Sequence, residues 1–404
     1  HRVDRRQRQM CIRDSIKIHL YLIVLPIIIS VIGLLNVSDR EQIGPFTMDH
    51  LAWLMGSFIL ILGFIIQKFS VRYLIGDRNY RKYFPLFTLI TSFASIAWLS
   101  GDLRLMVLFW GATLLSLTLL IRVNRSWKIP YEAAKVSGKS FALGWLSLLV
   151  AVILLYVATG NWHINVTLAN DDVITSGMRF IIDMLIVLAV IVPAAQFPFQ
   201  SWLIESVAAP TPVSAIMHAG IVNAGGIILT RFSPVFNDPL AITILLIIAS
   251  ISVLLGSGIS LVHVDYKRQL VGSTMSQMGF MLVQCALGVY SAAIIHLILH
   301  GVFKATLFLQ SGSVVKRFNI PIPPSAKRSY SWVVLGRCLA IIIAILFWLG
   351  SDRSAYEILS ALILAWSLMV SWNQMVAFSR GLIGRVIGII TVSYTHLTLP
   401  TIYS

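Results

Sequence analysis

The stretch Gln196–Arg231 reads QFPFQSWLIESVAAPTPVSAIMHAGIVNAGGIILTR and follows an apolar helix long enough to lie in a membrane. It contains Pro198, Pro210 and Pro212. A proline inside a helix removes a backbone donor and clashes with the preceding turn, so we predict a broken helix here. Irregular backbone at membrane depth is tolerated where protein buries it or water lines it, as in transporters that build sites from discontinuous helices. We therefore expect function to centre on this stretch.

The composition of the whole chain indicates a polytopic membrane protein. Of 404 residues, 57% are hydrophobic and 12% charged, and the mean hydropathy is +0.85. Such a chain has too little polar surface for a soluble globule, so the lipid bilayer is its expected partner. The net charge of +15 is explained by basic cytoplasmic loops, and no nucleic-acid partner is expected. Cys11, Cys285 and Cys338 lack metal-site spacing, and no disulfide is expected.

The two ends of the chain resemble translated sequencing adapter. Residues 5–15 read RRQRQMCIRDS and residues 392–401 read VSYTHLTLPT. Codons ATG-TGT-ATA for Met10-Cys11-Ile12 give TAT-ACA-CAT on the opposite strand, which encodes Tyr394-Thr395-His396. We therefore expect segments 1–15 and 392–404 to be artefacts, with one membrane domain at 16–391 that is cut from a longer gene. The alternative is a basic N-terminal arm and an ordinary tail.

Apolar runs of spanning length predict an all-α protein with about 12–13 transmembrane helices, since spanning β-strands would be about half as long. The runs lie near 18–36, 51–67, 84–100, 103–121, 141–158, 177–195, 199–230 (the broken one), 239–261, 271–289, 291–315, 333–350 and 355–377, and another starts near 382.

Loop charge predicts the orientation of these helices. If the broken span counts as one crossing, the basic loops all fall on one face. Positive loops are retained on the cytoplasmic side, so we predict a multi-pass protein of the bacterial cell (inner) membrane with a cytoplasmic N-terminus. The residues on that face are Lys68, Arg72, Arg78, Arg81, Lys82, Arg122, Arg125, Lys128, Lys135, Lys139, Lys267, Arg268, Lys316, Arg317, Lys327, Arg328, Arg380 and Arg385.

One apolar helix carries three basic residues in a row. His296, His300 and Lys304 are spaced by four, which places them along one side of a helix. Ionisable residues inside membrane spans are costly and are functional candidates, and a lysine with two imidazoles can pass protons. The alternative is structural, with Lys304 bound to neighbouring carbonyls and the histidines hydrogen-bonded across helices. Zinc binding by His296 and His300 fits their spacing, but the sequence offers no third ligand.

The broken span supplies two further candidates. His218 follows Pro212 by six residues and is expected in the N-terminal half of the resumed helix, among small residues that allow close helix packing. Glu205 lies in the break, where we expect nearby helix ends with free amides to favour its charge. His218 is predicted to belong to an ion pathway, whereas Glu205 either gates ions or caps a helix.

Asp183 lies in the preceding span, four residues after Arg179, so a local ion pair is possible. Pathway and structural roles both remain open for Asp183. Asp265, Lys267 and Arg268 lie in a basic loop and are interpreted as a topology signal or a partner contact. The sequence contains no phosphate-binding glycine loop, nucleophile elbow or metal cluster, so we do not expect this chain to be an enzyme by itself or to hold a cofactor.

Three motifs closely resemble the antiporter-like subunits of respiratory complex I, a family that includes Mrp-type cation antiporter and membrane-hydrogenase subunits. They are PTPVSAIMHAG (210–220), STMSQMGFM (273–281) and HLILHGVFKATLFLQSGS (296–313), within a similarity that runs from Tyr73 to Val315. The resemblance implies a helical membrane subunit with a proton path along its midplane. Matching pathway positions are His218, His296, His300 and Lys304.

Two departures separate this chain from the pumping members of that family. Pumping subunits usually carry an intramembrane glutamate where Gly111 follows Trp110, and a lysine where Pro193 precedes Ala194. The segment after Ile320 also lacks their lysine-bearing broken helix. A central glutamate–lysine pair is therefore missing, which argues against a complete complex I pumping cycle.

The segment MHAGIVNAGGIILTRFSP (217–234) resembles the membrane subunit of the DAB-type inorganic-carbon transporter. That resemblance implies a large cytoplasmic-side partner with a zinc site like that of β-carbonic anhydrase. Flow of protons or sodium through the membrane subunit would then energise hydration of carbon dioxide to bicarbonate in the partner, which holds the zinc. The alternatives are a proton-pumping or cation/proton antiporter subunit of a complex I-like or Mrp assembly, and a non-conducting membrane anchor for the partner.

Overall fold

The computed structural model describes residues 2–37, 41–124, 128–169 and 173–311, with six isolated positions between 334 and 345. Residues His1–Val314 form one compact unit. Apart from those isolated positions, the spans predicted near 333–350, 355–377 and from 382 lie outside the described residues, as do the basic residues after 311.

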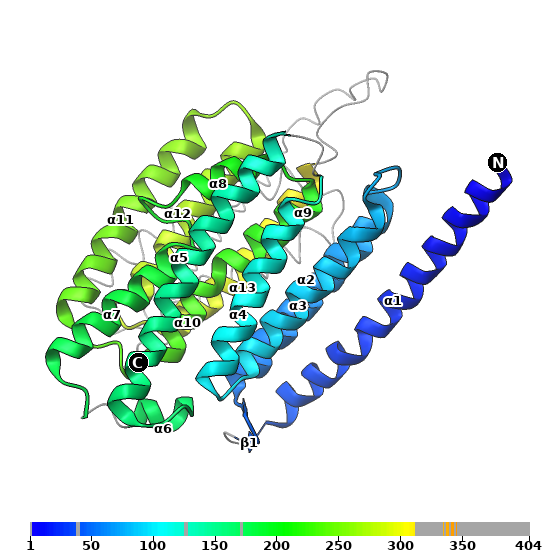
Figure 1. Cartoon of the computed structure of the whole chain (residues 1–404). Coiled ribbons are helices and arrows are strands. Elements are labelled where there is room, and N and C mark those ends of the chain that lie inside the picture. The colour runs from blue at the N-terminus through cyan, green and yellow to red at the C-terminus, as the bar shows by residue number, and fades with distance from the viewer. Residues whose placement is uncertain are drawn as a thin grey trace. The chain divides into compact units, whose positions relative to one another are not determined.

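The described part of this unit is a bundle of helices (Figure 1). Each predicted span up to residue 311 is confirmed as one helix or, for the broken span, as several. The single helices are α1 (Arg2–Asn36), α2 (His50–Tyr73), α3 (Tyr80–Leu99), α4 (Leu103–Ile121), α5 (Lys128–Thr159), α7 (Ser176–Ile191), α11 (Pro239–Val262), α12 (Tyr266–Ala286) and α13 (Tyr290–Ser311). The broken span consists of α8 (Ser201–Glu205), the 3₁₀ turn η2 (Ser206–Ala208), α9 (Thr211–Ala219), the 3₁₀ turn η3 (Ile221–Asn223) and α10 (Ala224–Phe232).

The lengths and composition of these helices fit a membrane protein. Eight stretches of the described chain are long and apolar enough to cross a bilayer, and α9 to α10 count as one of them. That broken stretch is also the most buried, with 89% of its window inside the protein. It packs against α13, α7 and α12, so its irregular backbone is shielded from lipid.

Three short elements were not predicted from the sequence. Strands β1 (Glu41–Ile43) and β2 (Phe46–Met48) form an antiparallel hairpin between α1 and α2. Gly44 in its turn has φ +59°, a backbone conformation that glycine adopts without strain. Helix α6 (Ile164–Ala169) follows α5. Runs this short carry no periodic hydrophobic signal.

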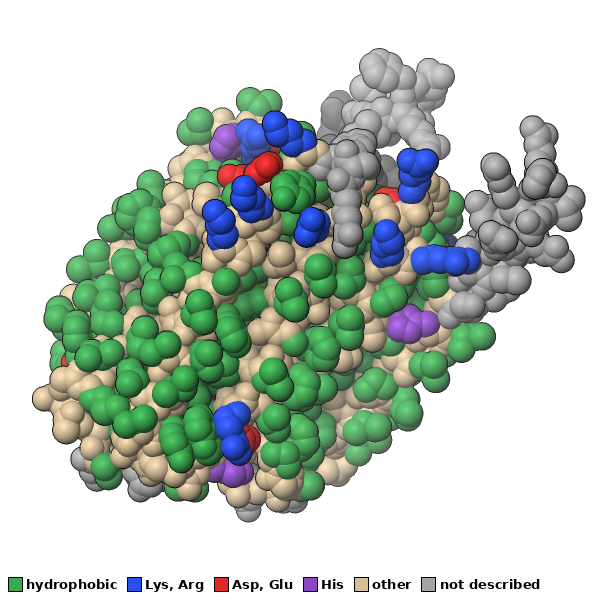
Figure 2. All heavy atoms as spheres, viewed as in Figure 1, with side chains coloured by type: hydrophobic (Ala, Val, Ile, Leu, Met, Phe, Trp, Pro, Cys, Tyr) green, Lys and Arg blue, Asp and Glu red, His purple; other side chains and the backbone are tan. Residues whose placement is uncertain are grey.

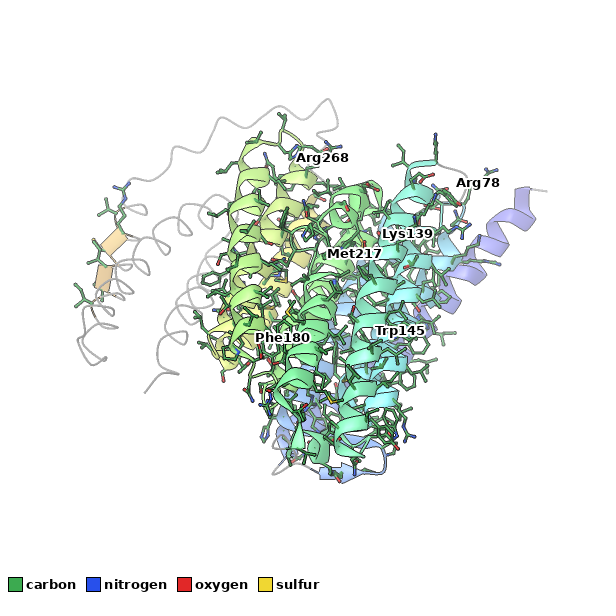
Figure 3. The ribbon with its side chains drawn as sticks, turned by 60° about the vertical axis from the view of Figure 1, so that its left-hand side comes forward. Arg78, Lys139, Trp145, Phe180, Met217 and Arg268 are labelled. Atoms are coloured by element: carbon green, nitrogen blue, oxygen red, sulfur yellow. The ribbon has the colours of Figure 1, made fainter. Side chains whose placement is uncertain are left out.

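Charged side chains gather at one end of the bundle, as Figure 2 shows. We call this the basic end, and it holds the loops between α2 and α3, α4 and α5, and α11 and α12. Arg78 and Arg268 lie there, Lys139 lies further along α5, and Phe180 lies toward the other side of the bundle (Figure 3). The prediction that the basic loops share one face is thus confirmed for the described loops. We call the other end, with Asp102 and Asp238, the opposite end.

Candidate functional site

The first interruption of the broken span lies at the three prolines that predicted it. Pro198 lies in the turn between α7 and α8, while Pro210 is the N-cap residue of α9 and Pro212 lies in the first turn of α9. The missing N–H of a proline costs little at such helix starts, where the first amides have no intrahelical partner anyway. The carbonyl of Val192, where α7 ends, accepts hydrogen bonds from the backbone amide of Ala195 at 3.1 Å and from the indole Nε1 of Trp202 at 2.9 Å.

A second interruption within the same span was not predicted. Helix α9 ends at Ala219, and Gly220 joins it to η3. In a continuous helix the carbonyl of Ala219 would accept from the backbone amide of Asn223, but that amide bonds to Gly220 instead. The side-chain Nδ2 of Asn223 donates to the Ala219 carbonyl at 2.7 Å in its place. The freed backbone group is therefore satisfied within the protein, as membrane depth requires.

This second interruption places His218 differently from the prediction. His218 lies in the last turn of α9, just before the break, and not near the start of a long resumed helix. Its side chain is completely buried, and its ring stacks on Phe308 with centroids 4.3 Å apart. Neither ring nitrogen has a hydrogen-bond partner in the described part of the chain. Met217, its neighbour, lies well inside the bundle in Figure 3.

Helix α13 brings the basic row against α9. Gly301 allows this contact, because a Cβ there would come within 2.7 Å of the Ala219 carbonyl oxygen. His300 is 6% exposed, and both of its ring nitrogens also lack partners among the described residues. Lys304 is 1% exposed and lies within electrostatic range of both His300 and His218. The two helices thus form one cluster of buried basic groups.

The remaining contacts separate the structural from the functional interpretation of this row. Lys304 Nζ donates to the backbone carbonyl of Leu270 at 3.2 Å, as the structural alternative proposed. The same alternative proposed cross-helix hydrogen bonds for the histidines, and His218 and His300 make none with described residues. The ring of His296, which is half-buried, lies near the rings of Phe280 and His300, with centroid distances of 5.6 and 6.1 Å.

The unpaired imidazoles have a chemical consequence. A buried polar group without a partner costs roughly 1–3 kcal/mol, so most such groups in native proteins bind ordered water or an ion. His218 and His300 together leave four ring nitrogens unpaired within the described chain. Water between them, beside the Lys304 ammonium, would form a short relay for protons. No three His, Cys, Asp or Glu side chains of the described residues converge on a metal position.

The comparisons with known proteins agree with this arrangement. The family model described as "NADH:quinone oxidoreductase/Mrp antiporter, TM" matches residues 100–388, and "NADH-Ubiquinone oxidoreductase (complex I), chain 5 N-terminus" matches residues 44–84. A protein of Bacillus subtilis named "Probable inorganic carbon transporter subunit DabB" is 60% identical over 93% of this chain and 74% of its own length. One of Bacillus anthracis with the same name is 54% identical over 96% of this chain and 77% of its own length.

The chain belongs to the DabB family of antiporter-like membrane subunits. A solved structure, that of the Mrp complex from Dietzia sp. DQ12-45-1b, superposes with a TM-score of 0.69 at 23% identity, covering 96% of this chain and 44% of that one. The antiporter-like fold predicted from three motifs is therefore confirmed.

In this DabB-family chain, Lys267 is more than a topology signal. It is half-buried at the start of α12, and its Nζ donates to the carbonyl of Ala209 at 3.1 Å, beside the first break. It also lies within electrostatic range of His218. Lys267 lies near the break because α12 packs against α8 and η2. The spacing of residues in the sequence does not reveal this packing.

Two predicted site residues lie outside the cluster. Asp183 is completely buried in α7, and its Oδ2 accepts from the backbone amides of Asn237 and Asp238, at 3.1 and 2.8 Å. Glu205 is the last residue of α8 and is exposed. Glu205 is also the N-cap residue of the 3₁₀ turn η2, so it lies between the carbonyl end of α8 and the first amides of η2, and its stabilisation by free amides stays a prediction. Its side chain makes no capping hydrogen bond to η2, and the N-cap residue of α9 is Pro210.

The two departures from pumping subunits have visible structural consequences. A Cβ at Gly111 would collide with the indole of Trp145, so this side chain occupies the place where a glutamate would begin. Trp145 Nε1 is fixed there by a hydrogen bond to the carbonyl of Val107 at 2.9 Å. Pro193 packs its ring against Gly144. The α4–α5 side of this DabB-family chain is therefore filled by an indole in place of a carboxylate.

An ion pair that sequence reasoning missed joins three helices near the opposite end. Arg231, in α10, binds both carboxylate oxygens of Asp49 and also donates to the carbonyl of Trp98 at 3.0 Å. Asp49 is in turn the N-cap residue of α2 and accepts from the amide of Ala52 at 2.8 Å. The N-cap position of Asp49 before an apolar run was a signal that could have been found.

Proposed function

We propose that this chain conducts protons or sodium through the cluster of His218, His296, His300 and Lys304. In this proposal, that flow energises inorganic-carbon (bicarbonate) accumulation by a carbonic-anhydrase-like zinc partner. The observation that carries the proposal is the pair of buried imidazoles without hydrogen-bond partners in the described chain, beside a buried lysine at a helix break. The names of the two Bacillus relatives, both inorganic carbon transporter subunits, support the carbon substrate.

The cost of this cluster argues against a non-conducting anchor. Ionisable groups within the bilayer are expensive, and an anchor would be more stable with apolar side chains at these positions. Yet Lys304 and His300 are almost fully buried among helices that would otherwise be apolar. The backbone at the break makes its hydrogen bonds with other groups and does not need these basic side chains. Ion passage therefore explains their presence better than a non-conducting anchor does.

The α4–α5 side argues against a complete complex I pumping cycle. Trp145 fills the position of the missing glutamate at Gly111. The four proposed conducting groups lie on α9 and α13, away from Gly111 and Trp145 of α4 and α5. Such a route suits a single coupling subunit better than a chain of pumps linked by lateral carboxylate–lysine pairs.

The partner is proposed to bind at the basic end on the cytoplasmic side of a bacterial (inner) membrane. Basic loops are retained in the cytoplasm, which also places the N-terminus there. The zinc and the hydration of carbon dioxide belong to the partner in this proposal, and this chain supplies the ion flow. Carboxylates, imidazoles and carbonyls serve both protons and sodium, so the coupling ion is left to experiment.

Complementation tests the proposal. The full-length gene is expressed with and without its neighbouring gene in bacteria that lack carbonic anhydrase, and growth is measured in ordinary air. We expect the pair to rescue growth and either gene alone to fail. If both proteins are present in the membrane and growth is not restored, carbon uptake is refuted.

Variants in the same assay separate conduction from anchoring. Lys304→Met and His300→Ala should abolish rescue while the protein level in the membrane is unchanged. Lys139→Met is the matched control, because Lys139 is exposed on α5 and should tolerate the change. Full rescue by Lys304→Met would support the anchor. Rescue that fails with a sodium ionophore but persists with a protonophore would identify sodium as the coupling ion.

A further inference from the structure

Asp183 lies near the opposite end of the bundle, and one of its two carboxylate oxygens has no hydrogen-bond partner among the described residues. Its Oδ2 is held by the amides of Asn237 and Asp238, which belong to the connection between α10 and α11. Asn237 is exposed, so this connection lies at the protein surface. The other oxygen, Oδ1, is buried and has no hydrogen-bond partner in the described part of the chain. Arg179, one turn earlier in α7, lies within electrostatic range of the carboxylate. The loop explains the hydrogen bonds of one oxygen, and the second oxygen has no hydrogen-bond partner among the described residues.

Helix α13 begins at Tyr290, which lies within electrostatic range of Asp183. The same helix carries His296, His300 and Lys304 further along. With a rise of about 1.5 Å per residue, Tyr290 and His296 are roughly 9 Å apart along the helix axis. A gap of about two turns along α13 therefore separates Tyr290 from the basic row.

Gln284 of α12 lies at a height in the bundle between Tyr290 and His296 of α13. Helices α12 and α13 are packed, antiparallel neighbours, and the Phe280 ring contacts the His296 ring. Gln284 follows Phe280 by four residues, so it lies on the same face of α12, one turn closer to the opposite end. It is 9% exposed, and its Oε1 lacks a partner among the described residues. A buried amide oxygen with no partner at this level indicates a bound water or ion.

We propose that Asp183, Tyr290 and Gln284 line a hydrated half of the ion pathway, which leads from the opposite end of the bundle to His296. This route rests on the proposed function for its cargo, a proton or sodium ion, and adds the side chains that such an ion meets first. Asp183 Oδ1 is the outermost acceptor, and Gln284 Oε1 bridges it to the basic row. Unpaired acceptors at successive levels are what a file of water or a passing cation would occupy.

Thiol accessibility tests the route without reference to carbon uptake. Cys11, Cys285 and Cys338 of the full chain are first replaced by serine or alanine, and Gln284→Cys is then introduced. A small, positively charged, membrane-impermeant methanethiosulfonate is added to vesicles of each orientation. Leu282→Cys is the matched control on the same helix, because Leu282 is completely buried and packs beside Gly225.

The expected result is one-sided labelling. Gln284→Cys should react from the face opposite the basic loops roughly tenfold or more faster than Leu282→Cys, because only a hydrated thiol ionises to the reactive thiolate. Labelling at the control rate from both faces would overturn the route. Since thiol labelling needs no partner and no carbon substrate, its result is independent of the complementation result.

A conservative substitution tests Asp183 itself. In Asp183→Asn the amide oxygen can still accept from Asn237 and Asp238, but the charge and the second acceptor are lost. We expect Asp183→Asn and Gln284→Leu to reduce growth rescue at least tenfold at unchanged protein level, measured against Leu282→Met. Full rescue by Asp183→Asn would assign the carboxylate to the loop alone. If Asp183→Asn fails to accumulate, labelling of Gln284→Cys still decides the route.

Discussion

Removal of Arg231 should strongly destabilise the protein, because it leaves the Asp49 carboxylate buried without its counter-charge. Arg231 and Asp49 are 9% and 7% exposed, and Arg231 contacts both oxygens of the carboxylate. Breaking a buried pair by removing one partner costs about 3–5 kcal/mol. Asp49 keeps the amide of Ala52 as a donor, so we expect Arg231→Leu to cost about 3 kcal/mol, at the lower end of that range.

The chain offers an exposed pair as the matched control. Arg104 binds Asp102 at 2.6 Å, but the side chain of Arg104 is 60% exposed. Exposed ion pairs contribute about 0–1 kcal/mol, so Arg104→Leu should be nearly neutral. The assay is the temperature at which half of the detergent-solubilised full-length protein aggregates. At roughly 2 °C per kcal/mol for a large domain, Arg231→Leu should lower this midpoint by about 6 °C.

A double variant distinguishes lost charge pairing from lost packing. The substitution Asp49→Asn removes the negative charge but keeps a side-chain oxygen that can still cap α2. Combined with Arg231→Leu, it removes both charges, and replacing both partners of a buried pair is often close to neutral. We therefore expect the double variant to recover most of the lost midpoint. If Arg231→Leu matches Arg104→Leu, or the double variant recovers nothing, the reasoning is refuted.

Three further changes follow from the structure. Gly111→Glu should lower the amount of folded protein in the membrane severalfold, since Trp145 occupies the space, and adding Trp145→Ala should restore it; equal levels in both variants would contradict this. Gly301→Val should abolish rescue and lower the aggregation midpoint, because α13 could no longer approach α9, whereas Gly301→Ala should be milder. The hydrogen bond from Arg104 lowers the pKa of Asp102, so the ionised carboxylate stabilises the protein above its unfolded pKa of about 4, and this stability is lost as the pH falls through the lowered folded pKa. The difference in aggregation midpoint between wild type and Asp102→Asn should therefore stay constant from pH 7 to about 4 and shrink at lower pH. A difference that shrinks already above pH 4 would contradict this.

The sequence predicted the helices well because hydrophobic length is a local property. Each predicted span up to residue 311 coincides with helix over most of its length, and the prolines correctly marked the first break. The second break could not be predicted in the same way. Gly220 is one of several glycines in a small-residue segment, and only the side-chain bond from Asn223 to Ala219 shows where the helix ends.

The sequence named most of the candidate residues but did not predict which of them are in contact. Spacing by four placed His300 and Lys304 on one side of α13, and the structure adds that His218 of α9 meets them there. The roles of Lys267 and Gln284 depend on which carbonyl or ring lies across the helix interface. Such pairings are long-range in sequence, and a single chain without its relatives carries no signal for them.

The position of the unpaired groups gives the break its meaning. Both interruptions satisfy their freed carbonyls within the protein, through Trp202 at Val192 and Asn223 at Ala219. Water is therefore not needed to stabilise the broken backbone. It is needed by the side chains beside it, where the nitrogens of His218 and His300 have no partner in the described chain. A break that only relieved proline strain would not need unpaired imidazoles beside it, so the polar groups at this position support the ion passage that we propose for this span.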